Sequence, residues 1–274
     1  MTSTTLPRSE LTPGLSGWRG GEGPPLLLIH GVGLCADAWA PMLPFLTRHF
    51  AVTALDLPGH GDSPNLPDGH DVTLQDYSDR IAELLSSWGG RSLVVGHSLG
   101  ALIALDLAIR HSQRVSAIAP LNSVFRRSED ASKSVMARLQ ELDGSNTPDP
   151  TQTLIRWFGE TPKGEDAVMA DHCRRWLTEV DPLGYRRAYS VFASQDGPTD
   201  DDLKKLACPA LFVTGSKEPN STPDMSSAMA RLTPRGRAVI IDGGRHMMPM
   251  THAAEVCAHL LEFCKHLDGT HERF

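Results

Sequence analysis

The stretch Arg91-Ser-Leu-Val-Val-Gly-His-Ser-Leu-Gly-Ala-Leu-Ile-Ala-Leu-Asp106 decides the fold. Its apolar residues 93–95 predict a buried strand, and residues 99–109, apolar on nearly every side, predict a helix in the core. Between them stands Gly96-His97-Ser98-Leu99-Gly100. We interpret this segment as a sharp turn that lifts the Ser98 hydroxyl above the end of a sheet, with glycines where the turn brings backbones close together. The Gly-x-Ser-x-Gly pattern alone is weak, and the flanking strand and helix make it specific.

Short apolar runs alternate with helical patterns over most of the remaining chain. The segment 73–88 has helical spacing of its apolar residues, and Thr73 with Asp76 predicts a capped start. This alternation predicts β-α-β units around a mainly parallel sheet, hence an α/β fold. The predicted buried strands are 26–29, 51–55, 93–95, 115–119, 211–213 and 238–241.

The alternation stops between about Val124 and Leu206, where the sequence becomes charged, aromatic and punctuated by proline. We predict a helical insertion over 124–206 in a core formed by 1–123 and 207–274. Trp157 and Trp176 fall inside the insertion and are candidates for contact with a substrate. Packing within the insertion is the more common role of such rings.

Composition restricts the class of partner. The chain has 274 residues, 26 Lys and Arg against 33 Asp and Glu, and a formal charge of −7, without a run of basic residues. These features argue against a nucleic acid or an anionic membrane as partner and favour a small molecule. Five cysteines without Cys-x-x-Cys spacing indicate neither a disulfide framework nor a zinc site. The start MTSTTLPRSE lacks the apolar core of a signal peptide, and no apolar run is long enough to span a membrane, which predicts a cytoplasmic protein.

The loop His30-Gly31-Val32-Gly33 follows the predicted strand 26–29. Its small residues let backbone N–H groups point into the space above the sheet. Together with the Ser98 turn, the loop predicts an oxyanion hole in which the N–H groups of Val32 and Leu99 bind the negative oxygen of a tetrahedral intermediate.

A histidine stands on the loop after the last predicted strand, in Asp242-Gly-Gly-Arg-His246. An imidazole, whose unperturbed pKa is about 6.5, can take a proton from serine at neutral pH and return it to a leaving group. The sequence contains 12 histidines, and His246 is the one we predict to be the general base. The further histidines near the C-terminus lack a thiol or carboxylate cluster at ligand spacing, so no metal site is predicted.

Ser98 in its turn, His30-Gly31, the segment Asp56-Leu-Pro-Gly-His-Gly-Asp-Ser63 and His246 together resemble the α/β-hydrolase fold family. The resemblance covers about residues 15–267. It implies an eight-stranded, mostly parallel sheet, here without the first hairpin strand because little chain precedes Leu26. It also implies that residues 124–206 form a lid-like cap and that 56–63 is scaffold.

At the acid of the catalytic triad this sequence departs from the pattern of the family that it resembles. Similar proteins usually carry aspartate three residues after a glycine that ends a late strand, and the matching residue is Glu218, after Gly215. The order Ser, Glu, His is the expected one. Some relatives place the acid after the strand that enters the cap, where this chain has the neutral Asn122. Asp224 and Asp242 remain as weaker alternatives to Glu218.

The resemblance implies a cap-bearing serine hydrolase that cleaves a carboxylic ester or related acyl bond through an acyl-serine intermediate, without cofactor or metal. The aromatic insertion favours a small or medium, partly hydrophobic substrate. Arg126 and Arg127 could pair with a substrate carboxylate, although surface arginines are more common. Lactone, amide or carbon–carbon bond hydrolysis remain alternatives, as does a non-catalytic small-molecule receptor. A haloalkane dehalogenase would need aspartate in place of Ser98.

Overall fold

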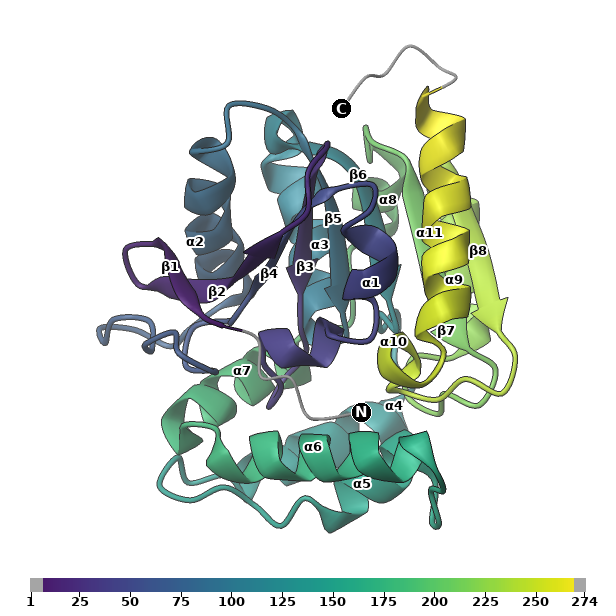
Figure 1. Ribbon diagram of the computed structural model, residues 1–274. Coiled ribbons are helices and arrows are strands. Elements are labelled where there is room, and N and C mark those ends of the chain that lie inside the picture. Colours follow the sequence, from purple (N-terminus) through teal and green to yellow (C-terminus); the bar gives the residue numbers. More distant parts are fainter. Residues whose placement is uncertain (1–6, 269–274) are drawn as a thin grey trace.

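The computed structural model describes residues 7–268. In this range an eight-stranded sheet has the order β1-β2-β4-β3-β5-β6-β7-β8, and the strands from β4 to β8 in that order run parallel (Figure 1). The six predicted strands are all present, one with its predicted bounds and five slightly longer. The strands are β1 (Ser9–Thr12), β2 (Leu15–Gly20), β3 (Pro25–Ile29), β4 (Ala51–Leu55), β5 (Ser92–His97), β6 (Val115–Leu121), β7 (Ala210–Gly215) and β8 (Gly236–Ile241).

The expectation that the first hairpin strand is missing is wrong. β1 and β2 form an antiparallel hairpin, and β2 continues antiparallel onto β4. At the edge of the sheet the hairpin buries few apolar side chains, chiefly Leu11 and Leu15. A search for buried apolar runs therefore does not detect it. Residues 1–6, part of the stretch that lacks a signal-peptide core, and 269–274, the end of the predicted core, lie outside the described residues.

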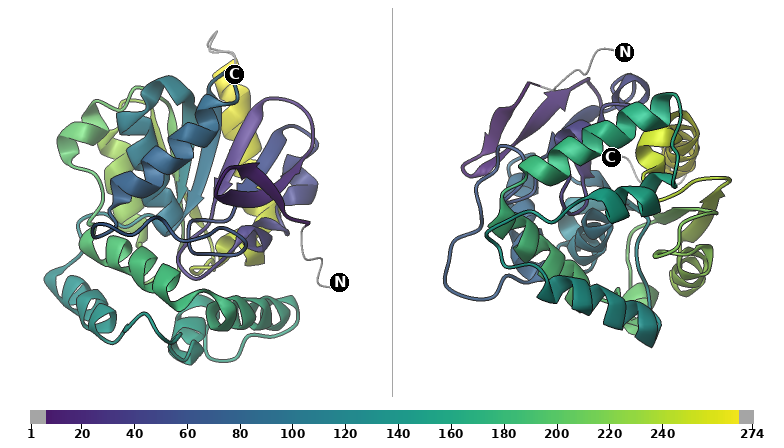
Figure 2. Two further views of the ribbon diagram at one scale, coloured as in Figure 1. Left: turned by 90° about the vertical axis from the view of Figure 1, so that its left-hand side faces the viewer. Right: turned by 90° about the horizontal axis from the view of Figure 1, so that it is seen from below.

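Helices cover both faces of the sheet (Figure 2). One face packs against α2 (Leu74–Ser86), α3 (Leu99–Arg110) and α9 (Pro223–Leu232), and the other against α1 (Leu43–Leu46) and α11 (Ala253–Asp268). Side chains along each strand alternate between these two layers. In β3, Leu27 and Ile29 join the first apolar cluster, whereas Leu26 and Leu28 join the second. Both clusters are fully buried around the central strands, which makes the sheet a rigid support for the loops at its ends.

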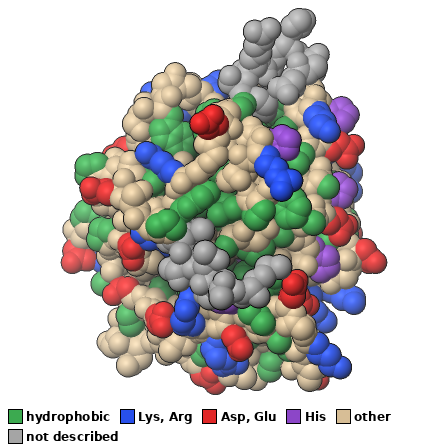
Figure 3. Space-filling view, viewed as in Figure 1, with side chains coloured by type: hydrophobic (Ala, Val, Ile, Leu, Met, Phe, Trp, Pro, Cys, Tyr) green, Lys and Arg blue, Asp and Glu red, His purple; other side chains and the backbone are tan. Residues whose placement is uncertain are grey.

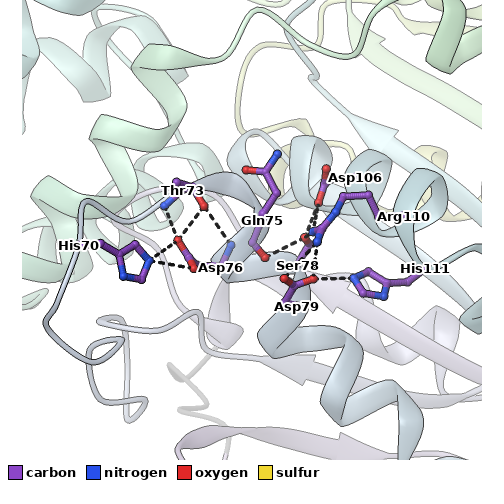
Figure 4. Close-up of polar contacts among 9 residues, drawn as sticks. All are labelled: His70, Thr73, Gln75, Asp76, Ser78, Asp79, Asp106, Arg110 and His111. Carbon is purple, nitrogen blue, oxygen red and sulfur yellow. Dashed lines mark hydrogen bonds and ion pairs between the residues drawn. The ribbon is translucent and has the colours of Figure 1, made fainter.

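The helix expected over 73–88 is present as α2, with a capping box between Thr73 and Asp76. Figure 4 shows the polar contacts that tie α2 to α3, the helix that follows Ser98. Arg110 of α3 donates to the Ser78 hydroxyl at 3.0 Å and pairs with Asp106 at 3.2 Å. The Ser78 hydroxyl also donates to the Asp106 carboxylate. These contacts fix the C-terminal end of α3, whereas the Ser98 turn precedes its N-terminal end.

Residues between β6 and β7 form helices, and within the described part of the chain they contain no strand. The helices lie across one end of the sheet, as the view from below in Figure 2 shows. Their division from the core at 124–206 remains a prediction. They are α4 (Glu129–Gln140), α5 (Thr151–Phe158), α6 (Glu165–Glu179), α7 (Pro182–Ser194) and α8 (Asp200–Lys204).

Helix α7 rests directly on the backbone of the loop that follows β4. A Cβ atom added at Gly184 would lie 2.3 Å from the carbonyl oxygen of Gly59, and one added at Gly59 would lie 2.5 Å from Cα of Gly184. Distances this short leave room only for hydrogen at both positions. The two glycines therefore allow backbone to touch backbone where the inserted helices meet the core.

The surface shows mixed charge. On the face seen in Figure 3, acidic and basic side chains are interspersed, without a continuous basic area. Among the helices described, none combines the length and apolar character needed to cross a membrane.

Candidate active site

Five candidate residues follow the carboxyl ends of five neighbouring parallel strands. Val32 follows β3, Ser98 follows β5, Asn122 follows β6, Glu218 follows β7 and His246 follows β8. In an open parallel sheet these ends lie at one edge, where α/β proteins place their ligand sites. The topology thus brings together residues that are up to 214 positions apart in the sequence. Apart from Glu218, all of them line the same cavity.

Ser98 occupies a strained turn between β5 and α3. Its φ is 57° and its ψ is −116°, outside the conformations that non-glycine residues normally adopt. A Cβ atom at Gly96 would lie 1.9 Å from the Gly100 carbonyl oxygen, and one at Gly100 would lie 2.1 Å from the Ile29 carbonyl oxygen. Only glycine fits at both positions, so the turn depends on the pattern read from the sequence. Backbone strain of this kind is typical of functional sites.

Glu218 and His246 are paired by a hydrogen bond. His246 Nδ1 lies 2.9 Å from Glu218 Oε2, and both side chains are buried. The other carboxylate oxygen accepts the backbone N–H groups of Asn220 at 2.8 Å and Ser221 at 3.2 Å. Burial alone would raise the pKa of the Glu218 carboxyl, but the charge and hydrogen bond of His246 and these two N–H groups hold it below its ordinary value. Glu218 is therefore a buried carboxylate that orients the imidazole.

The other three candidate positions for the acid are placed differently. Asn122 donates from Nδ2 to the His246 backbone oxygen at 2.7 Å and does not face the imidazole nitrogen. Asp242 is exposed and accepts from the Ser216 hydroxyl at 3.2 Å. Asp224 is exposed in the first turn of α9. Of the four, Glu218 has the geometry of a triad acid.

The loop expected to supply oxyanion donors lies against Ser98. A Cβ atom added at Gly31 would lie 2.9 Å from Ser98 Cβ. The Gly33 N–H donates to His60 Nε2 at 3.0 Å, which fixes the loop directly after Val32. Leu99 is the first residue of α3, so its N–H has no partner inside the helix. Both backbone groups are thus placed beside the serine turn.

A cavity of about 400 Å³ lies above Ser98 and His246, between the core and the inserted helices. Its volume suits a small molecule. Aromatic side chains make up much of its wall, and arginine side chains supply its positive charge. The lining residues are Val32, Ser98, Asn122, Val124, Arg127, Ala131, Ser134, Val135, Ala137, Arg138, Glu141, Thr153, Arg156, Trp157, Tyr185, Tyr189, Phe192, Asn220, Ser221 and His246.

The two tryptophans singled out in the sequence have different places. The Trp157 ring lines the cavity and stacks on the His246 imidazole, with ring centroids 5.3 Å apart and an angle of 25° between the planes. Trp176 is not among the cavity residues; it packs in an apolar cluster with side chains of the inserted helices and of the core. Its placement supports a packing role, whereas that of Trp157 supports contact with a substrate.

Arg126 and Arg127 also differ from each other. Arg126 is exposed, pairs with Asp200 and does not line the cavity. Arg127 lines it, but its guanidinium already pairs with Asp196 at 3.1 Å and donates to the Phe192 carbonyl at 3.0 Å. Arg127 thus links segments of the insertion to one another.

Sequence reasoning missed two further arginines in the cavity wall. Arg138 of α4 donates to the Tyr185 hydroxyl at 3.4 Å, and its buried Nε has no hydrogen-bond partner. Arg156 of α5 donates to Thr153 Oγ1 at 3.3 Å, and burial together with the nearby charge of Arg138 lowers its pKa. Within residues 7–268 neither guanidinium forms an ion pair with a carboxylate, but Glu141 lies in the same wall, and against the effect of burial Tyr185 and the charge of Glu141 help to raise the pKa of Arg138. Both arginines line the cavity that also contains Ser98.

A sequence signal for Arg138 did exist. Ala131, Ser134, Val135 and Arg138 line the cavity and stand at positions i, i+3, i+4 and i+7 of α4. That spacing defines one helix face, and an arginine on the inward face of a helix is a candidate for ligand binding. Within residues 7–268, no cluster of three or more His, Cys, Asp or Glu residues could hold a metal ion.

Comparison with known proteins agrees with the fold. A family model described as the alpha/beta hydrolase family matches residues 26–259. The (E)-2-((N-methylformamido)methylene)succinate hydrolase of Acinetobacter baylyi is 36% identical over 86% of this chain and 88% of its own length. A pimeloyl-[acyl-carrier protein] methyl ester esterase of Edwardsiella ictaluri is 28% identical over 87% of this chain and 92% of its own. The structure of a thermophilic esterase from Thermogutta terrifontis superposes with a TM-score of 0.81 at 23% identity, covering 92% of this chain and 93% of that one.

Proposed function

The chain belongs to the alpha/beta hydrolase family, and on that premise we propose that it is a serine hydrolase that cleaves the amide bond of a small dicarboxylate. Its relatives are hydrolases, so hydrolysis is the reaction type to explain. In the proposal Ser98 is the nucleophile, His246 the general base and Glu218 the residue that orients and charge-compensates the imidazole. The backbone N–H groups of Val32 and Leu99 form the oxyanion hole.

The reaction proceeds through an acyl-serine intermediate. Ser98 Oγ attacks the carbonyl carbon while His246 takes the hydroxyl proton, and the oxyanion donors bind the resulting negative oxygen. Collapse of the tetrahedral intermediate breaks the carbon–nitrogen bond, and the imidazolium protonates the departing nitrogen. A water molecule, deprotonated by His246, then releases the acyl group from Ser98. Every step uses groups of this chain and water.

The observation that carries the substrate assignment is the pair Arg138 and Arg156. Arg138 is half-buried and its Nε lacks a hydrogen-bond partner, whereas Arg156 is more exposed. A substrate carboxylate would supply charge-assisted hydrogen bonds to both guanidinium groups. Both side chains line the cavity that contains Ser98 and His246. Two positive groups suit a substrate with two carboxylates. The carbon skeleton of such a compound is apolar and can pack against the aromatic side chains of the cavity wall.

The relative from Acinetobacter baylyi supports this choice, because its printed name gives a succinate derivative with an amide as its substrate. The sequence left amide hydrolysis as an alternative to ester hydrolysis, and we propose it first because the name of this relative supports it. Ester hydrolysis is the second candidate, favoured by the methyl ester esterase relative. The same triad performs both reactions.

We further propose that residues 124–206 act as a cap that closes over the substrate, with Trp157 in contact with it. Helices α4, α5 and α7 supply the cavity wall opposite Ser98. The proposal requires neither metal nor cofactor, and we place the enzyme in the cytoplasm, as the sequence predicts.

The first test uses purified protein with (E)-2-((N-methylformamido)methylene)succinate, its monoester and diester, and a panel of neutral esters and lactones. We expect the diacid to have the highest kcat/KM. Ser98→Ala should lower kcat by about 10⁴-fold or more while the circular dichroism spectrum stays unchanged. Equal kcat/KM for the diacid and the diester would contradict the dicarboxylate assignment.

A fluorophosphonate probe separates an enzyme from a receptor of the same fold. An activated serine reacts with this probe, whereas an idle serine in a binding protein does not. We expect rapid labelling of Ser98, located by peptide mass analysis and absent from Ser98→Ala. A protein that binds the diacid but resists labelling would be a receptor.

A further inference from the structure

The backbone carbonyl of His246 accepts hydrogen bonds from two buried side chains. His97 Nε2 lies 2.8 Å from this oxygen, and Asn122 Nδ2 lies 2.7 Å from it. His97 is 2% exposed and Asn122 is 1% exposed, so water does not compete for either bond. Because a carbonyl oxygen only accepts, His97 must carry its proton on Nε2. Two donors on one carbonyl of a loop residue form an unusually strong attachment point.

Both donors belong to the frame that holds the nucleophile. His97 is the last residue of β5 and pairs in register with Leu121 of β6, after which Asn122 follows. The Ser98 N–H donates to the Leu121 carbonyl at 2.9 Å. The Asn122 N–H donates to the Val213 carbonyl at 2.8 Å. The two donors and the serine are therefore fixed to the same three central strands.

His246, in contrast, stands on a loop that β8 leaves at the edge of the sheet. The preceding residues include the exposed Asp242 and the half-buried Gly243 and Arg245. On the ring side, Glu218 holds Nδ1, and the rings of Trp157 and His97 lie 5.3 Å and 4.8 Å from the imidazole centroid. These contacts orient the ring. Among residues 7–268, the two bonds to the carbonyl are the ones that tie the backbone of His246 directly to the strands that carry Ser98.

We infer that His97 and Asn122 are positioning residues, which hold the imidazole of His246 in reach of Ser98 by fixing its backbone carbonyl. The inference rests on the proposed roles of Ser98 and His246. It also gives a function to Asn122, the position after β6 that the sequence left open as an alternative for the acid. In this chain the amide of Asn122 positions the backbone of His246, while Glu218 supplies the negative charge beside the imidazole.

The protonation state of His97 fits this role. Burial, reinforced by the nearby His246, lowers the pKa of His97 to about 3. The ring therefore stays neutral across the working range of pH. A neutral donor can hold the carbonyl without repelling the imidazolium that forms during the reaction. Misplacement of a catalytic group by about 1 Å can lower a rate by about 10²-fold, so a loss of this size is the expected scale.

The first experiment removes the Asn122 donor. Asn122→Leu keeps the approximate size of the side chain, and we expect kcat to fall about 10- to 100-fold with KM changed less than about threefold. The rate of fluorophosphonate labelling should fall in parallel, because it depends on the same geometry. Asn146→Leu, the same exchange at an exposed loop position, is the matched control and should leave both rates unchanged. A normal kcat and labelling rate in Asn122→Leu would overturn the inference.

The second experiment examines His97, independently of how Asn122→Leu folds. His97→Gln retains an N–H donor at similar reach, whereas His97→Phe retains a ring without one. We expect His97→Gln to keep most of kcat and His97→Phe to lose about tenfold or more. Equal rates in the two variants would show that ring volume alone matters and would overturn the role of the hydrogen bond.

The third experiment separates positioning from acid placement. Asn122→Asp replaces the donor by a carboxylate that repels the His246 carbonyl, so kcat at pH 8 should fall and should not recover when combined with Glu218→Gln. Recovery in the double variant would identify the end of β6 as an acid position and overturn the inference. Failure of the proposed function has a different signature. In that case Ser98→Ala would remain active, or the wild-type protein would show neither labelling by the probe nor turnover.

Discussion

The imidazole of His246 and the carboxylate of Glu218 form a buried hydrogen bond of 2.9 Å between loops that follow β8 and β7. The second carboxylate oxygen is held by two backbone N–H groups, so the glutamate cannot turn away. The glutamate at this position thus holds a carboxylate oxygen against the imidazole from the loop after β7.

This relationship predicts the effect of removing the charge. Glu218→Gln keeps the size of the side chain but cannot stabilise an imidazolium, so kcat should fall by about 10²- to 10⁴-fold. Glu218→Asp retains the charge and should be milder. Steady-state kinetics with the best substrate measures both, and a near-normal kcat in Glu218→Gln would exclude Glu218 as the acid.

The pH profile of kcat/KM should show one acid limb between about pH 5 and 8, since a histidine base must be neutral to accept the serine proton. The neighbouring histidines do not add limbs. Burial lowers the pKa of His60 to about 4 and that of His97 to about 3, and it places the pKa of His30 well below its ordinary value. A flat profile from pH 5 to 8 would count against His246.

The two tryptophans should respond differently to truncation. Trp157→Ala opens the cavity beside His246 and should change relative rates among acyl groups by about 1–3 kcal/mol. Trp176→Ala leaves a hole in an apolar cluster and should lower the free energy of unfolding by about 3–5 kcal/mol, with the rate ratios unchanged. Kinetics on a graded substrate series and urea denaturation measure the two effects. Altered selectivity in Trp176→Ala alone would reverse these assignments.

The two cavity arginines, Arg138 and Arg156, should affect binding of the dicarboxylate substrate. Arg138→Gln or Arg156→Gln should raise KM for the dicarboxylate about 10- to 100-fold, the scale of a lost charge-assisted hydrogen bond, and leave fluorophosphonate labelling of Ser98 unchanged. Arg126→Gln, at an exposed guanidinium outside the cavity, is the matched control. If the control raised KM as much, general surface charge would explain the effect.

Much of the fold was predictable because the central strands are fully buried. Runs such as 26–29 and 93–95 are apolar on both faces, and a parallel sheet covered by helices requires such runs. The β1–β2 hairpin was not predicted, since an edge hairpin needs few buried side chains and leaves little apolar signal. The predicted helix over 73–88 also carried its own cap, Thr73 with Asp76.

The parts of the candidate site that could be predicted are those in which the local backbone requires particular residues or in which a residue follows a strand. Gly96 and Gly100 mark the Ser98 turn because no larger residue fits there. Glu218 and His246 each follow the end of a strand that could be predicted from the sequence. Arg138 and Arg156 lie on helices of the insertion, and their approach to Ser98 depends on how those helices pack over the sheet. The two bonds to the His246 carbonyl likewise involve residues more than 120 positions apart, which no local pattern signals.

The contact between Gly59 and Gly184 sets a rule for recombination of this chain with its relatives. Helix α7 carries the cavity residue Tyr185 directly after Gly184, and the cavity residue Tyr189 one turn later. A chimera that imports residues 124–206 from a donor with a larger side chain at this crossing would lift α7 and enlarge the cavity from above. A chimera that exchanges the insertion to obtain new substrates should therefore take residues 56–63 and 124–206 from the same donor protein.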